Sequence, residues 1–283
     1  MYPKLILIEG LPGFGKSTTA QLVYDILTET GIRAQLFLEG NLNHPADYDG
    51  VACLAEAEYD ELLGMWADSR HILSPRTTVH DSHYLVEYRK IIDEHGPLIP
   101  KEALDLLTRN DVYELPLAQN RELITARWRQ FAEKALQGAD TYVFDCCFIQ
   151  NPVTVGMIKH GAAEEDIVSY TLELEAITAR LNPLLMYIDQ DDLERSFRKA
   201  VRDRPLEWSE GFIEYYTKQG YGFKQGHQGL DGTLRVLEAR LKLEKIIYNR
   251  INMHKIKVNN SSYDLPAYKQ DLAGRLAGYL ERE

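Results

Sequence analysis

The strongest chemical signal in the sequence is a glycine-rich stretch close to its start. Residues 10–19, GLPGFGKSTT, fit the pattern G-x-x-x-x-G-K-[ST] at every fixed position. Glycines let a backbone turn tightly and bring its N–H groups toward phosphate oxygens. In such a loop Lys16 reaches the β- and γ-phosphates, and the Ser17 hydroxyl is placed to bind Mg²⁺. The residues expected to hold the phosphates are Gly10, Leu11, Pro12, Gly13, Phe14, Gly15, Lys16, Ser17 and Thr18. The stretch therefore predicts that a nucleoside triphosphate is bound.

The residues on either side of this loop fit the same role. Residues 4–8 form an apolar run typical of a buried strand, and residues 20–27 place apolar side chains at helical spacing. A helix that begins near Lys16 directs the positive end of its dipole at the phosphates. An ordinary strand–turn–helix is the alternative, and the intact motif in this context argues against it.

Strands and helices alternate along the rest of the chain. Because this pattern forms a parallel sheet with helices on both faces, we expect an α/β, three-layer P-loop NTPase fold with a five-stranded parallel sheet. The site of such a fold lies at the carboxyl ends of the strands. After the first strand, the other four are expected at Arg33–Leu38, Thr141–Phe144, Leu184–Ile188 and Lys255–Val258.

We expect a single domain over residues 1–283 with two additions to the sheet. Residues 41–138 are predicted to form a largely helical insertion, which includes a helix over Val51–Trp66. Residues 195–232 are predicted to form a lid that carries arginines. Five glycines between Gly220 and Gly232 predict that the end of this lid is a mobile loop.

Acidic residues occur where four of the strands are expected to end. Glu9 is expected to fix the loop geometry by accepting backbone N–H bonds, and Asp189 to cap the following helix. Glu39 is either a loop-capping carboxylate or a general base that faces an acceptor hydroxyl. Asp145 lies where an indirect magnesium ligand is found, so a role at the metal is favoured.

Arginines gather after the fourth expected strand, in a chain that is otherwise acidic. Arg195, Arg198 and Arg202 share one helix face by their spacing, and Arg204 follows at the end of the helix. Phosphoryl transfer needs donors that meet charge spread over the equatorial phosphate oxygens, so a catalytic lid is favoured. The alternative is a solvated basic face, paired with neighbouring acidic side chains.

Together these residues resemble the nucleoside and nucleotide kinases, most closely thymidylate kinases and deoxynucleoside kinases. The resemblance implies ATP and Mg²⁺ at the loop and the four arginines in the lid. It also implies Glu39 as the base, because deoxynucleoside kinases carry a glutamate at the end of the second strand. Two positions depart from the pattern. Gly40 follows Glu39 where a proline is frequent, and Cys146 follows Asp145 where an arginine is usual.

Composition limits the partners that we expect. The net charge of −11, from 32 basic and 43 acidic residues, opposes binding to a nucleic acid polymer. No apolar run approaches the length that spans a bilayer, and no secretory leader is expected, so neither is a membrane partner. Three cysteines among 283 residues favour a reducing, cytoplasmic location. A homodimer is compatible with the sequence, which does not determine the oligomeric state.

The expected function is ATP-dependent phosphoryl transfer to a small molecule, most simply a nucleoside or a nucleoside monophosphate. Two alternatives stay open: a regulatory protein that binds or hydrolyses nucleotide, and a kinase that acts on an antibiotic or a sugar. We expect the insertion to hold the phosphoryl acceptor. Its candidate aromatic and basic residues are His44, Trp66, Arg70, His80, His83, Tyr84, Tyr88, Arg121, Arg127 and Trp128. Trp128, Cys146 and Cys147 are more simply explained as packing residues.

Overall fold

The computed structural model describes residues 3–66 and 69–280, and the chain divides into two compact units. Unit 1 comprises Met1–Glu39 and Trp128–Glu283, and unit 2 comprises Gly40–Arg127. The long helix α6 (Leu117–Gln137) has residues in both units.

Unit 1 is built on a five-stranded parallel sheet, which confirms the predicted α/β class. The strand order is β2-β6-β1-β7-β8, so the first strand lies at the centre. The register pairs Ile8 of β1 with Asp145 of β6, and Gly10 of β1 with Ile188 of β7. The glycine-rich loop therefore leaves the sheet between the ends of two neighbouring strands. The strands are β1 (Leu5–Gly10), β2 (Ala34–Phe37), β6 (Thr141–Asp145), β7 (Leu184–Asp189) and β8 (His254–Asn259).

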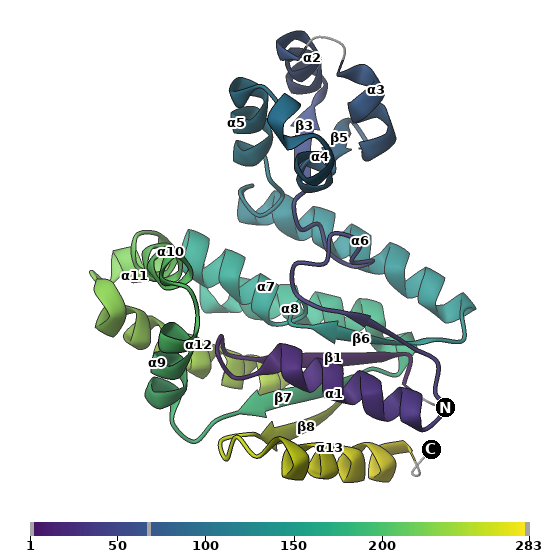
Figure 1. The fold of residues 1–283 in the computed structure, drawn as a ribbon, viewed down its shortest axis with the longest axis vertical. Helices are drawn as coiled ribbons and strands as arrows, with labels where there is room; N and C mark the ends of the chain where they lie inside the picture. Colours follow the sequence, from purple (N-terminus) through teal and green to yellow (C-terminus); the bar gives the residue numbers. More distant parts are fainter. Residues whose placement is uncertain (1–2, 67–68, 281–283) are drawn as a thin grey trace. The chain divides into compact units, whose positions relative to one another are not determined.

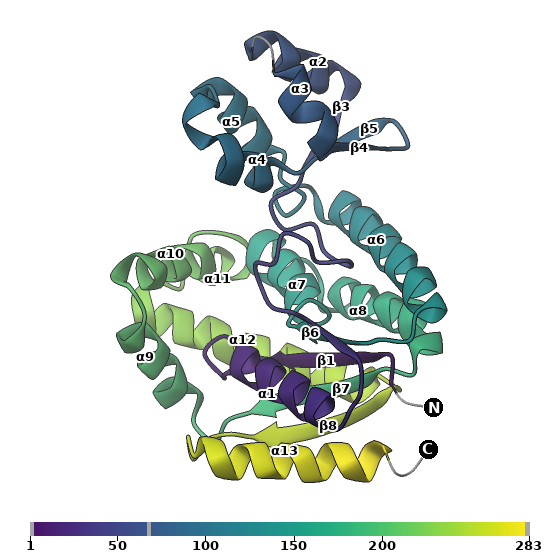
Figure 2. The same cartoon turned by 45° about the vertical axis from the view of Figure 1, so that its right-hand side comes forward.

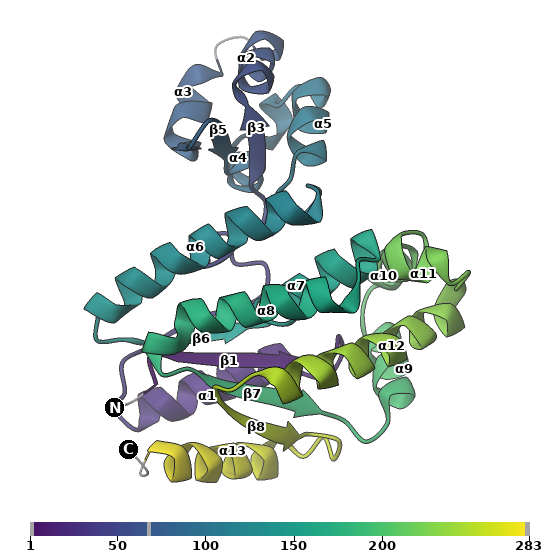
Figure 3. The same ribbon diagram turned by 180° about the vertical axis from the view of Figure 1, so that it is seen from behind.

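Helices cover both faces of this sheet and its carboxyl edge. Helices α1 (Lys16–Glu29) and α13 (Leu265–Leu280) lie on one face, and α8 (Glu164–Thr178) and α12 (Gly229–Arg250) lie on the other (Figures 1 and 3). Beyond the carboxyl ends of the strands lie α9, α10 and α11, which Figure 3 shows at the arrowheads. Their bounds are α9 (Leu193–Asp203), α10 (Leu206–Thr217) and α11 (Gly220–Lys224), and between β6 and α8 the chain forms α7 (Gln150–Val153) and a π-helical segment, Thr154–His160.

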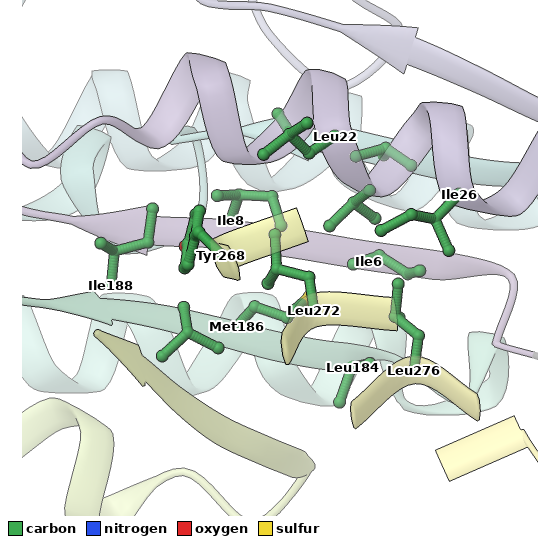
Figure 4. Packing of buried hydrophobic residues seen from close by; sticks show 14 of the residues in the cluster. Ile6, Ile8, Leu22, Ile26, Leu184, Met186, Ile188, Tyr268, Leu272 and Leu276 are labelled. Atoms are coloured by element: carbon green, nitrogen blue, oxygen red, sulfur yellow. The ribbon is translucent and has the colours of Figure 1, made fainter. Parts of the chain in front are cut away.

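Alternate residues of the central strands build the core on the α1 and α13 side. Ile6 and Ile8 of β1 and Met186 of β7 pack against Leu22 of α1 and Leu272 of α13 (Figure 4). Burying each such side chain contributes about 1.5–3 kcal/mol. Because side chains alternate along a strand, Glu9 then points to the opposite face, away from this apolar layer.

The glycine-rich segment at 220–232 is not a loop throughout, so the prediction of a mobile loop is wrong. It forms α11 and the first turn of α12, with turns between them. Its glycines serve close packing: a Cβ on Gly222 would clash with the backbone carbonyl of Tyr216, and one on Gly220 with that of Ile158. Gly220 also has a backbone φ of +42°, which residues other than glycine rarely adopt.

Unit 2 contains a three-stranded antiparallel sheet, so the prediction of a largely helical insertion was incomplete. The sheet order is β3-β5-β4, and Figure 2 shows the β4–β5 hairpin. The helix expected over residues 51–66 is shorter in the structure, because Ala52–Ala55 form the strand β3 and only Glu56–Met65 are helical. The elements are β3 (Ala52–Ala55), α2 (Glu56–Met65), α3 (Arg70–Leu73), β4 (Thr77–His80), β5 (His83–Val86), α4 (Tyr88–His95) and α5 (Lys101–Arg109). Across the described ranges, no helix is both long enough and apolar enough to cross a bilayer.

Candidate active site

The glycine-rich loop has the open geometry that anion binding requires. Gly10, Gly13 and Gly15 have φ values of +148°, +86° and +82°, a conformation that costs glycine little. Helix α1 starts at Lys16, and among the described residues no side chain caps its first turn. The N–H groups of that turn are therefore left for an anionic ligand. A Cβ on Gly13 would lie 3.1 Å from the Cβ of Ala200, so α9 packs closely on the loop.

Lys16 is buried beneath this loop, with only 7% of its surface exposed. Its Nζ donates one long hydrogen bond, 3.3 Å, to the carbonyl of Leu11. Burial is the largest influence on the pKa of Lys16 and lowers it, but Cys146, Glu39 and Asp145 together raise that pKa above its ordinary value. Lys16 is therefore a buried cation, and its Nζ has N–H donors that no described residue accepts. Such a group can bind phosphate oxygens.

Ser17 and Asp145 meet at the end of β6, as the strand order requires. The Ser17 hydroxyl donates to Asp145 Oδ2 over 2.6 Å. The other oxygen, Oδ1, is buried and has no hydrogen-bond partner among the described residues. Burial raises the pKa of Asp145, while the nearby charge of Lys16 and the bond from Ser17 lower it. The Cys146 thiol also lowers the pKa of Asp145. A thiol is a weak donor, and Oδ1 accepts no hydrogen bond of normal geometry from it, so Oδ1 is available to a ligand.

This pair fits a magnesium ion that is also held by phosphate. In proteins Mg²⁺ is bound through one or two carboxylates or hydroxyls, with substrate phosphates and water completing its six ligands. Ser17 and the free oxygen of Asp145 supply such groups. The described ranges contain no group of three or more His, Cys, Asp and Glu side chains that would hold a metal without a phosphate.

Glu9 organises the segment that follows Asp145. Its carboxylate accepts the backbone N–H groups of Phe148 (2.7 Å), Ile149 (2.9 Å) and Gln150 (3.0 Å). Burial raises the pKa of Glu9 to about 7, although these three bonds favour the charged form. Glu9 accepts backbone N–H bonds as expected, but the donors belong to the segment after β6 and not to the phosphate loop, so the expectation that Glu9 fixes the loop geometry is wrong.

We predict that Glu9 makes stability depend on pH between about 4.5 and 7. Because its pKa is raised from 4.5 to about 7 on folding, the native state holds the proton more tightly than the unfolded state. Stability therefore falls as pH rises through this window. Between pH 4.5 and 7.5 the free energy of unfolding of the natural chain should fall by about 3 kcal/mol more than that of Glu9→Gln. Urea denaturation across this range measures both, and parallel profiles would contradict the prediction.

Glu39 and Gln150 meet in a cavity of about 610 Å³, which we call the inner cavity. It is lined by residues that include Lys16, Ser17, Glu39, Gln150, Trp208 and Arg240. Gln150 Nε2 donates to Glu39 Oε1 over 2.7 Å. This bond fixes the amide orientation, because only the NH₂ end can donate to a carboxylate. Glu39 is thus an exposed carboxylate that lines the cavity beside the phosphate loop.

Arg240 is the functional candidate that sequence reasoning missed. Its side chain is fully buried, and the guanidinium donates to Glu244 Oε1 (2.6 Å), Tyr216 OH (2.6 Å) and Thr154 Oγ1 (3.1 Å). A signal was present in the sequence. Arg240 and Glu244 fall at helical spacing on the face that buries Leu237 and Ile247, where an amphipathic helix should be apolar.

The four predicted lid arginines are placed differently from one another. Only Arg204 lines the inner cavity, and its guanidinium lies 4.2 Å from the ring centre of Trp208. Arg198 is ion-paired with Glu194 (2.7 Å) and Asp231 (3.1 Å). Arg195 and Arg202 are exposed, and Arg202 lies beside Asp203. Neither of them lines the inner cavity or the cavity along α9.

A second cavity of about 300 Å³, the outer cavity, lies on the other side of the loop, along α9 and the start of α13. Its lining includes Thr18, Ser196, Lys199, Asn260, Tyr263 and Leu265. Asn260 Nδ2 donates to the carbonyl of Phe14 over 2.8 Å, which ties this wall to the phosphate loop. Gln190 donates to Asn260 and accepts from Ser196 Oγ over 2.9 Å, so the tie extends to α9. Phe14, Tyr263, Leu265 and Tyr268 also give this cavity apolar and aromatic surface, which suits the flat base of a nucleotide.

Asp189 does not cap the helix that follows it, so that prediction is wrong. Asp192 is the N-cap of α9, and its Oδ1 accepts the N–H of Arg195 over 2.8 Å. Asp189 instead accepts the N–H of Gln190 over 3.2 Å, next to its own strand end. The sequence contains an acidic residue at 189, 191 and 192, and only the last has the spacing of a cap.

Several residues proposed to bind the acceptor have packing roles within their own unit. In unit 2, Trp66 and Tyr88 are buried in its core, and Tyr84 stacks on Tyr59 with ring centres 4.2 Å apart. Burial lowers the pKa of His44 to about 3, with a smaller effect of Arg127 in the same direction. In unit 1, Trp128 is fully buried against Phe144, and Cys146 and Cys147 are buried free thiols, as expected of packing residues.

No model of a known protein family matches this chain, and no curated protein has a significantly similar sequence.

Proposed function

We propose that this chain is a P-loop phosphotransferase that uses Mg·ATP to phosphorylate a small molecule. The observation that carries the proposal is the 2.6 Å bond between Ser17 and Asp145, formed next to the buried Lys16 at the carboxyl edge of the sheet. A hydroxyl, a carboxylate with a free oxygen and a cation meet there beneath a loop of open N–H groups. That set matches the needs of a metal-bound triphosphate.

Each group has a role in the transfer. The loop amides and Lys16 hold the β- and γ-phosphates, and the outer cavity takes the base. Magnesium, bound by Ser17 and by Asp145 directly or through water, would neutralise charge on the phosphate oxygens. The acceptor oxygen attacks the γ-phosphorus, and the bond from that phosphorus to the β–γ bridging oxygen breaks, which releases ADP. Glu39 takes the proton of an acceptor hydroxyl, with Gln150 holding its carboxylate in place.

The inner cavity favours a kinase over a regulator that only hydrolyses nucleotide. A volume of about 610 Å³ next to Lys16 leaves space for a second substrate, and Glu39 faces that space. Cavities of this size usually hold small organic ligands. Trp208, Phe212 and Tyr215 supply flat surfaces within it. They suit an acceptor with a ring, and a nucleoside, a nucleoside monophosphate, a sugar or an antibiotic each meets that description.

A panel experiment tests the function. ATP consumption is measured with magnesium and, in turn, nucleosides, nucleoside monophosphates, sugars, aminoglycosides and simple alcohols. A kinase should consume ATP at least about tenfold faster with one class of acceptor than without it, and a phosphorylated product should appear by mass spectrometry. A rate that is indifferent to the whole panel, in a protein that still binds ATP, would favour the regulator instead.

We predict that Glu39→Gln leaves nucleotide affinity unchanged and slows transfer to a hydroxyl acceptor by about 10²–10⁴-fold, because the base is lost while the shape is kept. The measurement is kcat with the best acceptor, alongside the Kd for ADP. Glu210→Gln, on the exposed surface of α10, is the control that should change neither value. An unchanged rate in Glu39→Gln would rule out a base role and would fit a phosphate acceptor, which needs no base.

A further inference from the structure

Arg240 has two N–H donors that nothing in the described chain accepts. Its Nε and Nη1 are engaged by Glu244, Thr154 and Tyr216, whereas Nη2 is buried without a hydrogen-bond partner among the described residues. Arg240 lines the inner cavity, and Nη2 is the nitrogen of its guanidinium that no described residue engages. A buried donor without a partner is destabilising, and native proteins rarely leave one unsatisfied. An unpaired donor at this position is therefore suited to bind a ligand.

The rest of the network holds the guanidinium in one orientation. Glu244 is only 1% exposed; its Oε1 accepts from Arg240, and its Oε2 accepts the hydroxyl of Tyr187 over 2.7 Å. Glu244 therefore neutralises the positive charge through Nε, while Nη2 keeps donors that no described residue accepts. Such a group is already aligned for a hydrogen-bond acceptor and pays little entropy when it binds one.

The inner cavity that Arg240 lines is also lined by Lys16 and Ser17. Arg240 lowers the pKa of Lys16, which means that the two cations repel each other within the same site. An anion between them would remove that repulsion and would use the donors of both. The phosphate loop places the end of a bound triphosphate next to Lys16. Of the predicted lid arginines, only Arg204 lines this cavity, so most of the cationic donors expected there are absent.

We propose that Arg240 binds the γ-phosphoryl group of the bound triphosphate through Nη2, opposite Lys16, and stabilises that group during transfer. This inference rests on the proposed function, since it needs a triphosphate on the loop. It assigns to Arg240, which lies beyond the predicted lid, the role that was predicted for Arg195, Arg198 and Arg202. It also predicts a specific preference: the site should bind a triphosphate more tightly than the corresponding diphosphate, and Arg240 should supply that difference.

The test compares Mg·ADP with two probes that carry a γ-group, Mg·AMPPNP and Mg·ADP–beryllium fluoride, by isothermal titration calorimetry. The first variant is Arg240→Met with Glu244→Met, which removes the pair together and leaves no buried lone charge. The second is Arg240→Lys, which keeps a cation beside Glu244 and lacks Nη2. The matched control is Arg235→Met, an exposed arginine on the same helix.

Both Arg240 variants should bind ADP within about twofold of the natural chain and should bind the two γ-group probes at least about tenfold more weakly. Equal losses for all three ligands, or no loss for any, would overturn the inference. With no loss, Nη2 would face the acceptor or a water instead. The proposed function fails in a different way, since the natural chain itself would then bind neither ADP nor the probes.

Discussion

Lys16→Ala should reduce phosphoryl transfer by about a thousandfold or more while the protein stays folded. Lys16 is 7% exposed, and its one hydrogen bond to a described residue is the 3.3 Å bond to the carbonyl of Leu11, so its truncation breaks a single weak polar contact. Its charge lies beside Glu39 and Asp145. In the proposed reaction, this charge binds the β- and γ-phosphates. The melting temperature should stay within a few degrees, as expected for a change of about 1 kcal/mol in a chain of this size.

Two measurements check this result. The first is the rate of ATP consumption with the best acceptor, and the second is the melting temperature of the same sample. Lys242→Ala, an exposed lysine on α12, is the control that should keep full activity. If the Lys16→Ala protein still turned over at the natural rate, the glycine-rich loop would not be the donor site, and the assignment of Ser17 and Asp145 would fail with it.

The largest expected loss of stability follows from Arg240→Met alone. This change leaves Glu244 buried at 1% exposure without its cation, and it leaves Thr154 and Tyr216 without their donor. Removing one partner of a buried ion pair costs about 3–5 kcal/mol, a large share of the 5–15 kcal/mol that stabilises a typical protein. The free energy of unfolding from urea denaturation measures this loss.

The double variant Arg240→Met with Glu244→Met should recover most of that stability, because no unpaired charge is then buried. The four proteins of the cycle, natural, two single and one double, give the coupling energy of the pair directly. A double variant as unstable as the sum of the two single variants would show that the two side chains act independently. The network around Arg240 would then have been wrongly described as a pair.

The parts of the site that the sequence predicted are those that depend on local spacing or on the order of elements. The phosphate loop is one continuous stretch, so its glycines, Lys16 and Ser17 can be read directly. Asp145 is 128 positions from Ser17, yet the two meet because Asp145 ends β6 and the loop before Ser17 follows β1, its neighbour in one parallel sheet. Arg240 could not be placed in this way. Its partners Thr154 and Tyr216 lie on separate segments, and only tertiary packing brings them together.

The misplaced elements also have physical reasons. The strands β3, β4 and β5 have four residues each, too few for alternation to be told from a helical pattern. Ala52–Ala55 is in addition apolar at every position, which suits a buried strand and a buried helix equally. The glycines between 220 and 232 looked like a source of mobility, but Gly222 has its place because Tyr216 passes too close for a side chain.

The pairing of Arg240 with Glu244 has a consequence for ionic strength. Dissolved ions screen exposed charges over about 10 Å at 0.1 M salt, and they screen buried pairs much less. Arg198 and Arg202 have side chains 44% and 71% exposed, so any attraction that they exert on an incoming nucleotide should fade as salt is added. Arg240 is fully buried and already neutralised, and its hydrogen bonds should keep their strength in the same solutions. The association rate of the nucleotide should therefore fall as salt is added, whereas the contribution of Arg240 to its affinity should change little.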